Sequence, residues 1–120
     1  MAGWGRISSA ALLASGIAGI VTPTKFSAAL DLPAISSRGT AETRAGLGGT
    51  YAGLGGWAFL RGDAAADRAI GVTWLGAGLV RIAALAIDRP DTDWTYWAYL
   101  AGELTLGTLS LASARAAVGR

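Results

Sequence analysis

Long apolar runs separated by short polar segments set the pattern of this chain. Residues 69–87 and 94–114 are apolar except for one charged residue each, Arg81 in the first run and Glu103 in the second. About 20 mostly apolar residues in a helix cross the hydrocarbon core of a bilayer. The link between the runs, residues 88–93, is short and charged and contains a proline. We therefore expect two antiparallel membrane helices joined by a tight connection.

Two earlier segments have the same character. An apolar run follows Trp4 and Arg6, and a glycine-rich run leads up to Arg61. A positive flank before an apolar run is also typical of a signal peptide, but we favour a retained helix. The sequence thus predicts an all-α, integral membrane four-helix bundle that forms a single domain over residues 1–120. The predicted spans are residues 6–22, 42–61, 68–88 and 94–115.

The segment between the first two spans is less regular. Residues 22–25 contain a proline that either ends or kinks the first helix. Residues 26–30 form either a last turn or a helix in the membrane interface. Residues 31–40 are rich in turn-forming residues and are predicted to be a loop. Thr40 or Thr43 is then expected to cap the second span.

Composition agrees with a membrane protein and excludes several kinds of chemistry. The chain is 52% hydrophobic and 15% charged, with a mean hydropathy of +0.45, whereas soluble domains average about 25% charged residues. It has no cysteine and no histidine, which removes thiolate nucleophiles, imidazole bases and most zinc, copper and haem ligands. Its basic residues are scattered, unlike a nucleic-acid footprint. We expect no catalytic residues, no metal, no cofactor and no nucleic-acid partner.

Arg81 and Glu103 are predicted to pair with each other. Arg81 lies seven residues before Asp88, and Glu103 lies nine residues after Trp94. At 1.5 Å per residue, both are about 10 to 13 Å from the same membrane surface. A lone charge in the middle of a membrane helix costs at least about 2.5–3.5 kcal/mol, so each needs a partner. The pair is either a structural latch or a site where an ion or polar ligand is bound or passed.

Further polar residues are candidates for a cluster around this pair. Helical spacing places all of them except Glu42 on faces of the second, third and fourth spans, two of which also carry Arg81 or Glu103. Glu42 is expected on the same side of the membrane. The candidates are Glu42, Arg44, Tyr51, Trp74 and Tyr99. If the three faces converge, the cluster is either a network that fixes helix register or a ligand pocket.

The glycine-rich second span indicates close helix packing. Gly49 and Gly53 form a GxxxG pair, which lets another helix backbone approach closely. That helix belongs either to this chain or to another subunit, including a second copy of the chain. If both termini lie on one side, that side carries five basic residues and the other carries four. This small bias favours cytoplasmic termini in a multi-pass protein.

The order of these features resembles a known family. The E-x-R-x-G-x-G-G stretch at residues 42–49, Arg81 deep in the third span and Glu103 in the fourth resemble the DUF4345 group of small four-helix bacterial membrane proteins. The resemblance covers the chain from about residue 42 onward. It implies four helices in the bacterial plasma membrane and no established activity.

Two classes of function follow from these features. The first is a non-catalytic subunit or accessory protein that packs in the lipid against another membrane protein or in a homo-oligomer. The second is a binder or carrier of a small polar or lipidic ligand, with Arg44, Arg81 and Glu103 at its site. An enzyme is not expected, because nothing in the sequence supplies Glu42 or Glu103 with a catalytic partner.

Overall fold

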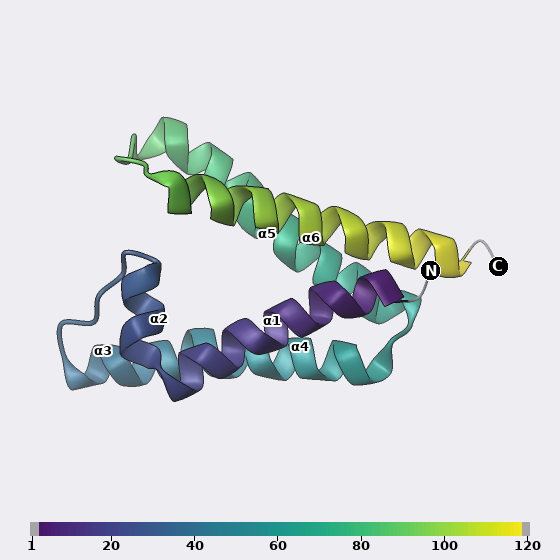
Figure 1. The fold of residues 1–120 in the computed structure, drawn as a ribbon, viewed down its shortest axis with the longest axis horizontal. Coiled ribbons are helices and arrows are strands. Elements are labelled where there is room, and N and C mark those ends of the chain that lie inside the picture. Colours follow the sequence, from purple (N-terminus) through teal and green to yellow (C-terminus); the bar gives the residue numbers. More distant parts are fainter. Residues whose placement is uncertain (1–2, 119–120) are drawn as a thin grey trace. The chain divides into compact units, whose positions relative to one another are not determined.

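The computed structural model describes residues 3–118, and every regular element in this range is a helix, which confirms the all-α prediction. In chain order they are α1 (Gly3–Val21), α2 (Pro23–Ala29), α3 (Ser37–Glu42), the π-helix η1 (Thr43–Gly49), α4 (Thr50–Arg61), α5 (Ala64–Ile87) and α6 (Trp94–Val118) (Figure 1). The chain divides into two compact units. The α1–α4 unit is Ser9–Arg61, and the hairpin unit is Gly62–Arg120 with Met1–Ser8. The four-helix bundle and the single domain stay predictions.

The chain between the first two long helices is more helical than the sequence indicates. After a break at Thr22, α2 follows α1, and α3 begins inside the segment expected to be a loop. Ser36 caps α3, because its side chain accepts a hydrogen bond from the backbone N–H of Gly39 at 3.0 Å. The helical backbone then continues through η1 to the end of α4. The prediction that Thr40 or Thr43 caps the second span is therefore wrong.

The third long helix, α5, begins at Ala64, four residues before the start of the predicted span 68–88. Asp63 caps α5, because its side chain accepts a hydrogen bond from the backbone N–H of Ala66 at 2.9 Å. Asp67 lies in the first turn of α5, where the helix dipole favours a negative charge.

The α1–α4 unit is held together by direct contact between helix backbones. A Cβ atom added to Gly48 would lie 2.7 Å from the backbone nitrogen of Ile20, and one added to Gly55 would overlap the backbone of Leu13. Only glycine allows this approach, which is the usual way that membrane helices pack closely.

Gly49 and Gly53 do not take part in this contact. A Cβ atom added to Gly53 would meet nothing within 4 Å, and one added to Gly49 would meet only the carbonyl of Arg44 on its own helix. Within the described part of the α1–α4 unit this pair therefore packs closely against no other helix, and its packing against another helix stays a prediction. This helix carries glycines both at the contact with α1 and at open positions, so the GxxxG spacing does not identify the side that Gly48 and Gly55 present to α1.

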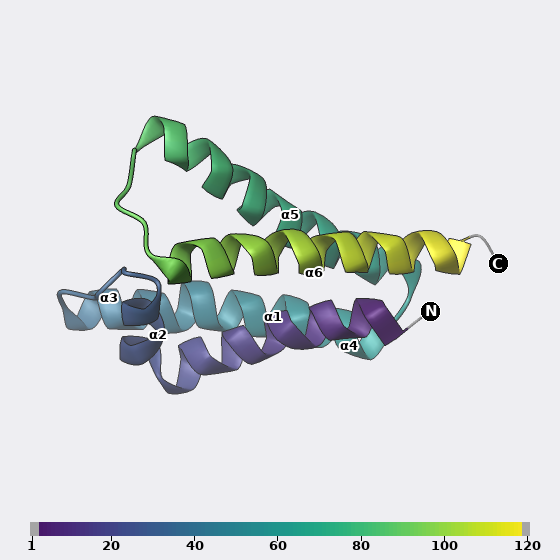
Figure 2. The ribbon, with the colours of Figure 1, turned by 45° about the horizontal axis from the view of Figure 1, so that its top comes forward.

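In the hairpin unit, α5 and α6 are antiparallel and in contact (Figures 1 and 2). A Cβ atom added to Gly71 would lie 2.7 Å from Leu111 Cδ2, and one added to Gly107 would lie 2.9 Å from the backbone nitrogen of Leu75. Each of these glycines is thus in close contact with a leucine of the facing helix. The helices diverge toward their link at residues 88–93 (Figure 2).

Asp93 caps the first turn of α6. Its Oδ1 atom accepts hydrogen bonds from the hydroxyl of Thr95 and from the backbone N–H groups of Thr95 at 3.1 Å and Tyr96 at 3.2 Å. The hydroxyl of Thr95, followed by the N–H of Tyr96, holds the pKa of Asp93 below its ordinary value of 3.8. The charged carboxylate is therefore the form that stabilises the start of α6.

This cap predicts a pH dependence at the start of α6. Because the pKa of Asp93 is lowered in the folded state, the stabilisation is present above pH 3.8 and is lost as the pH falls through the lower folded value. Amide chemical shifts of Thr95 and Tyr96, followed by NMR in detergent micelles, should move only below pH 3.8. The variant Asp93→Asn should abolish this transition, and a wild-type transition at higher pH would contradict the assignment.

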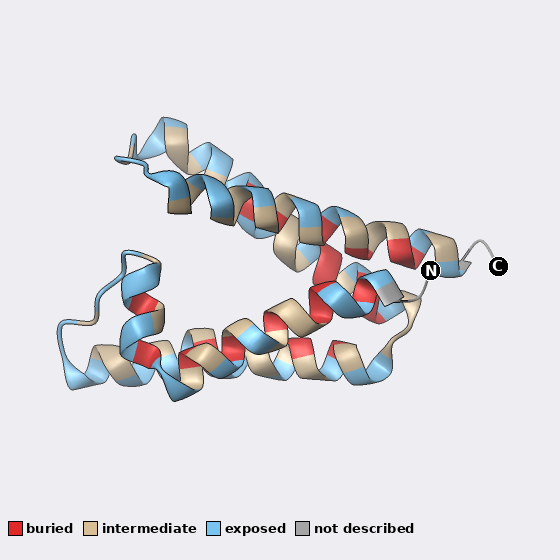
Figure 3. Cartoon of the chain, viewed as in Figure 1, coloured by how far each residue is buried: buried red, intermediate tan, exposed pale blue. Residues whose placement is uncertain are grey.

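The hydrophobic side chains are distributed in the opposite way to those of a soluble protein. Among the described residues, the fully or nearly buried polar side chains are Ser8, Ser9, Ser27, Asp67, Glu103, Ser110 and Ser113. The buried hydrophobic ones are Leu12, Ala58, Ala66, Ile70 and Ala114. Large apolar side chains lie outside instead, among them Leu60 at 83% and Ile87 at 77% exposure. Figure 3 colours the helices by burial, and buried residues are only a small part of each helix. Soluble proteins normally bury such residues.

Two helices within residues 3–118 are long and apolar enough to cross a membrane. They are Trp4–Val21 in α1 and Ala64–Ile87 in α5. Only 33% and 17% of their most apolar stretches are buried. The core helix of a soluble protein would be mostly buried, and neither of these two helices is.

Candidate functional site

Arg81 of α5 and Glu103 of α6 form a bidentate ion pair. The Nε atom of Arg81 donates to Oε1 of Glu103 at 2.7 Å, and Nη2 donates to Oε2 at 3.0 Å. Their side chains are only 23% and 11% exposed. The structure thus brings together the two charges that the sequence predicts to pair. Two parallel N–H···O bonds are the strongest arrangement that these groups form.

Two tyrosines of α6 complete the surroundings of the pair. The hydroxyl of Tyr96 donates to the backbone carbonyl of Arg81 at 2.7 Å. The guanidinium carbon of Arg81 lies 5.1 Å from the ring centroid of Tyr96 and 5.6 Å from that of Tyr99. Both rings are within cation–π range. Tyr99 is thus at the site as expected. Tyr96 lies seven residues from Glu103 and was expected on the same helix face, although it was not singled out as a site residue.

Trp74 has a different role from the one expected. Its indole N–H donates to the backbone carbonyl of Ser8 at 3.1 Å, and the hydroxyl of Ser8 donates to the carbonyl of Leu106 at 2.7 Å. These bonds tie the start of α1 to both α5 and α6. Trp74 is about 10 Å along α5 from Arg81, so its hydrogen bond serves helix packing rather than the ion pair.

The remaining candidates lie in the α1–α4 unit. Glu42 forms an exposed ion pair with Arg38 at 3.3 Å. Arg44 donates from Nη1 to the backbone carbonyl of Ile20, near the end of α1. Tyr51 lies half-buried in α4. The convergence of these residues with the ion pair of the hairpin unit stays a prediction.

A second buried polar cluster, which sequence reasoning missed, surrounds Asp67. This residue is 4% exposed, and its Oδ2 atom accepts a hydrogen bond from the hydroxyl of Ser113 at 2.8 Å. The hydroxyl of Ser110 donates to the backbone carbonyl of Asp67 at 2.7 Å. A Cβ atom added to Gly5 would overlap the carboxylate. The spacing of three between the serines, on one face of α6, was the available signal.

Removing the hydroxyl of Ser113 should destabilise the hairpin unit. Ser113→Ala leaves a buried carboxylate oxygen of Asp67 without this donor, which costs about 1–3 kcal/mol. The hydroxyl of Ser15 bonds to the carbonyl of Ala11 one turn earlier on its own helix, so Ser15→Ala should cost less than about 0.5 kcal/mol. Thermal unfolding in detergent compares the two variants, and equal effects would contradict a structural bond between Ser113 and Asp67.

The chemistry of the described residues is that of ion pairs and hydroxyl contacts. No group of three or more Asp or Glu side chains lies where it could hold a metal ion among these residues. No protein-family model, curated protein or solved structure matches this chain. The resemblance to the DUF4345 group therefore stays a prediction.

Proposed function

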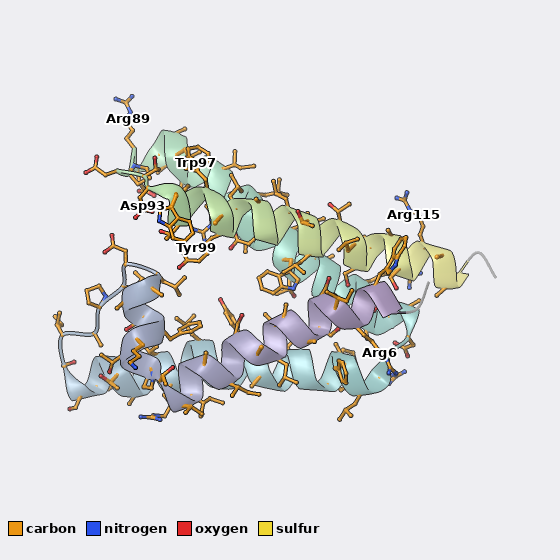
Figure 4. The ribbon with its side chains drawn as sticks, viewed as in Figure 1. Arg6, Arg89, Asp93, Trp97, Tyr99 and Arg115 are labelled. Carbon is orange, nitrogen blue, oxygen red and sulfur yellow. The ribbon has the colours of Figure 1, made fainter. Side chains whose placement is uncertain are left out.

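We propose that this chain is a multi-pass integral protein of the bacterial plasma membrane with four spans. The observation that carries the proposal is the inverted burial, with serine, aspartate and glutamate inside and large apolar side chains outside. In lipid, an apolar exterior has no cost, and polar groups must find partners inside. Arg89 and Arg115 project from opposite ends of the hairpin unit (Figure 4), as expected of charges that flank a span. Both termini are proposed to be cytoplasmic.

Within the membrane, the proposed role is that of a non-catalytic subunit or accessory protein. The interior charges are engaged with each other or with hydroxyls: Arg81 with Glu103, and Asp67 with Ser113. Gly49 at the end of η1 and Gly53 in α4 leave an open side on this continuous helix, which we name the α4 glycine face. It allows the backbone of a partner helix to approach closely. The partner is another membrane protein or a second copy, and the proposed family is the DUF4345 group.

A second candidate function is supported by the geometry of Arg81. Its bonds to Glu103 use Nε and Nη2, and the side chain remains 23% exposed beside Tyr96 and Tyr99. An anionic group of a small polar or lipidic ligand could contact this guanidinium. Such a ligand would displace the carboxylate of Glu103 from the guanidinium or share the guanidinium with it.

The test is gentle detergent extraction of the tagged chain from its native membrane, followed by mass spectrometry. We expect the wild type to retain a stoichiometric protein partner or a second copy. The double variant Gly49→Leu/Gly53→Leu should lose it, because two bulky side chains block the α4 glycine face. Gly76→Leu is the matched control, since a Cβ atom added there also meets nothing within 4 Å. A bare monomer that carries a defined small molecule would support the second candidate instead.

A further inference from the structure

The chain changes direction sharply where α1 ends. Thr22 leaves the helical conformation, with φ −128° and ψ 61°, and Pro23 starts α2 at its first position. Proline suits a helix start because its missing N–H is not needed there. Figure 1 shows α2 turned across the direction of α1. If α1 crosses a membrane, a helix turned in this way lies along the surface of that membrane.

One side of α2 is fixed to its own unit. Pro23 and Ser27 are buried, and the ring of Phe26 lies against Gly19 of α1, 3.6 Å from where a Cβ atom would be. Lys25 is exposed on the other side. The orientation of α2 within the α1–α4 unit is therefore set by packing.

The end of α2 holds the next residues in a defined position. The N–H of Asp31 donates to the carbonyl of Ala28 at 3.0 Å, and the N–H of Leu32 donates to the carbonyl of Ser27 at 2.8 Å. Asp31 has a φ of 57°. These two bonds around a left-handed residue form a Schellman motif. The short segment that follows is bounded at its other end by the Ser36 cap of α3.

Two large apolar side chains project from this segment. Ile35 is 97% exposed and Leu32 is 59% exposed. Both are held between two helix caps, so the fold presents them outward. Lys25 and Arg38 lie exposed on either side in the sequence, as in segments that rest at a membrane interface.

The level of this segment relative to α1 is fixed by Arg44. Its guanidinium bonds to the carbonyl of Ile20, so Arg44 lies beside the end of α1. The seven residues before it, from Ser37 to Thr43, extend about 10 Å further as a helix. Residues 22–36 connect these two ends. They therefore lie between the end of α1 and a level about 10 Å beyond it, where the interface of a membrane crossed by α1 would be.

We propose that residues 22–36 form an interface anchor, in which α2 lies along the lipid surface and Leu32 and Ile35 insert among the lipids. This inference rests on the proposed membrane location of α1. Leu32 and Ile35 are proposed to contact the lipid interface, because their segment follows directly from an apolar helix of spanning length.

The chain contains no cysteine, so a single introduced cysteine can carry a unique nitroxide label. Three variants are reconstituted in vesicles of phosphatidylethanolamine and phosphatidylglycerol: Ile35→Cys, Ser37→Cys and Leu79→Cys. Collision rates with oxygen, which concentrates in lipid, and with a water-soluble nickel chelate report the surroundings of each label. Ser37 is exposed two residues from Ile35, and Leu79 is exposed in the middle of α5.

We expect the ratio of oxygen to nickel collision rates at position 35 to be several-fold higher than at position 37 and lower than at position 79. If position 35 behaves like position 37 while position 79 lies in lipid, the interface anchor is wrong and the proposed function stands. If all three positions lie in water, the membrane proposal fails. A label at position 35 that is shielded from both reagents would show a protein partner there, and would also overturn the anchor.

Discussion

Replacing Glu103 with glutamine should lower the free energy of unfolding by about 3–5 kcal/mol, because it removes a buried carboxylate and leaves the half-buried charge of Arg81 without its counter-charge. Both oxygens of the carboxylate are bonded to the guanidinium, at 2.7 and 3.0 Å. An amide offers one acceptor and no charge in their place. The matched control is Glu42→Gln, which breaks the exposed pair with Arg38 and should cost no more than about 1 kcal/mol.

A double-mutant cycle separates the pair from the individual side chains. Arg81→Met alone should destabilise as Glu103→Gln does, whereas Arg81→Met/Glu103→Gln should recover most of the loss, since no unpaired charge remains. Unfolding of all four proteins in one detergent gives the interaction energy. A different result would favour the ligand site: Glu103→Gln would fold as stably as the wild type and lose a small molecule that the wild type retains.

Adding one methyl group at Gly55 should have the second large effect. Gly55→Ala places a Cβ atom on the backbone of Leu13 in α1. The two helix backbones must then move apart, and such overpacking costs about 1–3 kcal/mol or more. Thermal unfolding in detergent measures the loss.

Gly53→Ala is the matched control two residues away. A Cβ atom there meets nothing within 4 Å, so the substitution should be neutral or stabilise the helix by up to about 1 kcal/mol, the difference in helix propensity between the two residues. If Gly53→Ala destabilised the protein as much as Gly55→Ala, the contact between α1 and α4 would not be the one described.

The hairpin and its ion pair could be predicted from the spacing of charges. Arg81 and Glu103 are the single charges of two apolar runs, at similar distances from one link. The cost of a lone charge in an apolar medium then requires a partner. The rotation of each helix is set by side-chain packing over its whole length, so the bidentate geometry and the bond from Tyr96 did not follow from the sequence.

The cluster around Asp67 was missed for the same reason. This residue lies in the first turn of α5, where an aspartate is ordinarily exposed. Its burial depends on Gly5, whose missing side chain leaves space for the carboxylate, and on two serines near the other end of the chain. Contacts between residues 43 to 62 positions apart leave no local pattern. The cap at Ser36 was missed because serine is common both in loops and at helix starts.

The inverted burial has a consequence for how this sequence can change over generations. Side chains at outward positions such as Leu60 and Ile87 are mostly exposed. Exchanges among leucine, isoleucine, valine and phenylalanine should therefore be tolerated there. Inward positions such as Gly48 and Ser110 admit almost no other residue, because their neighbours leave no room. Descendants of a common ancestor would then keep their glycines, serines and paired charges while their bulky residues drift.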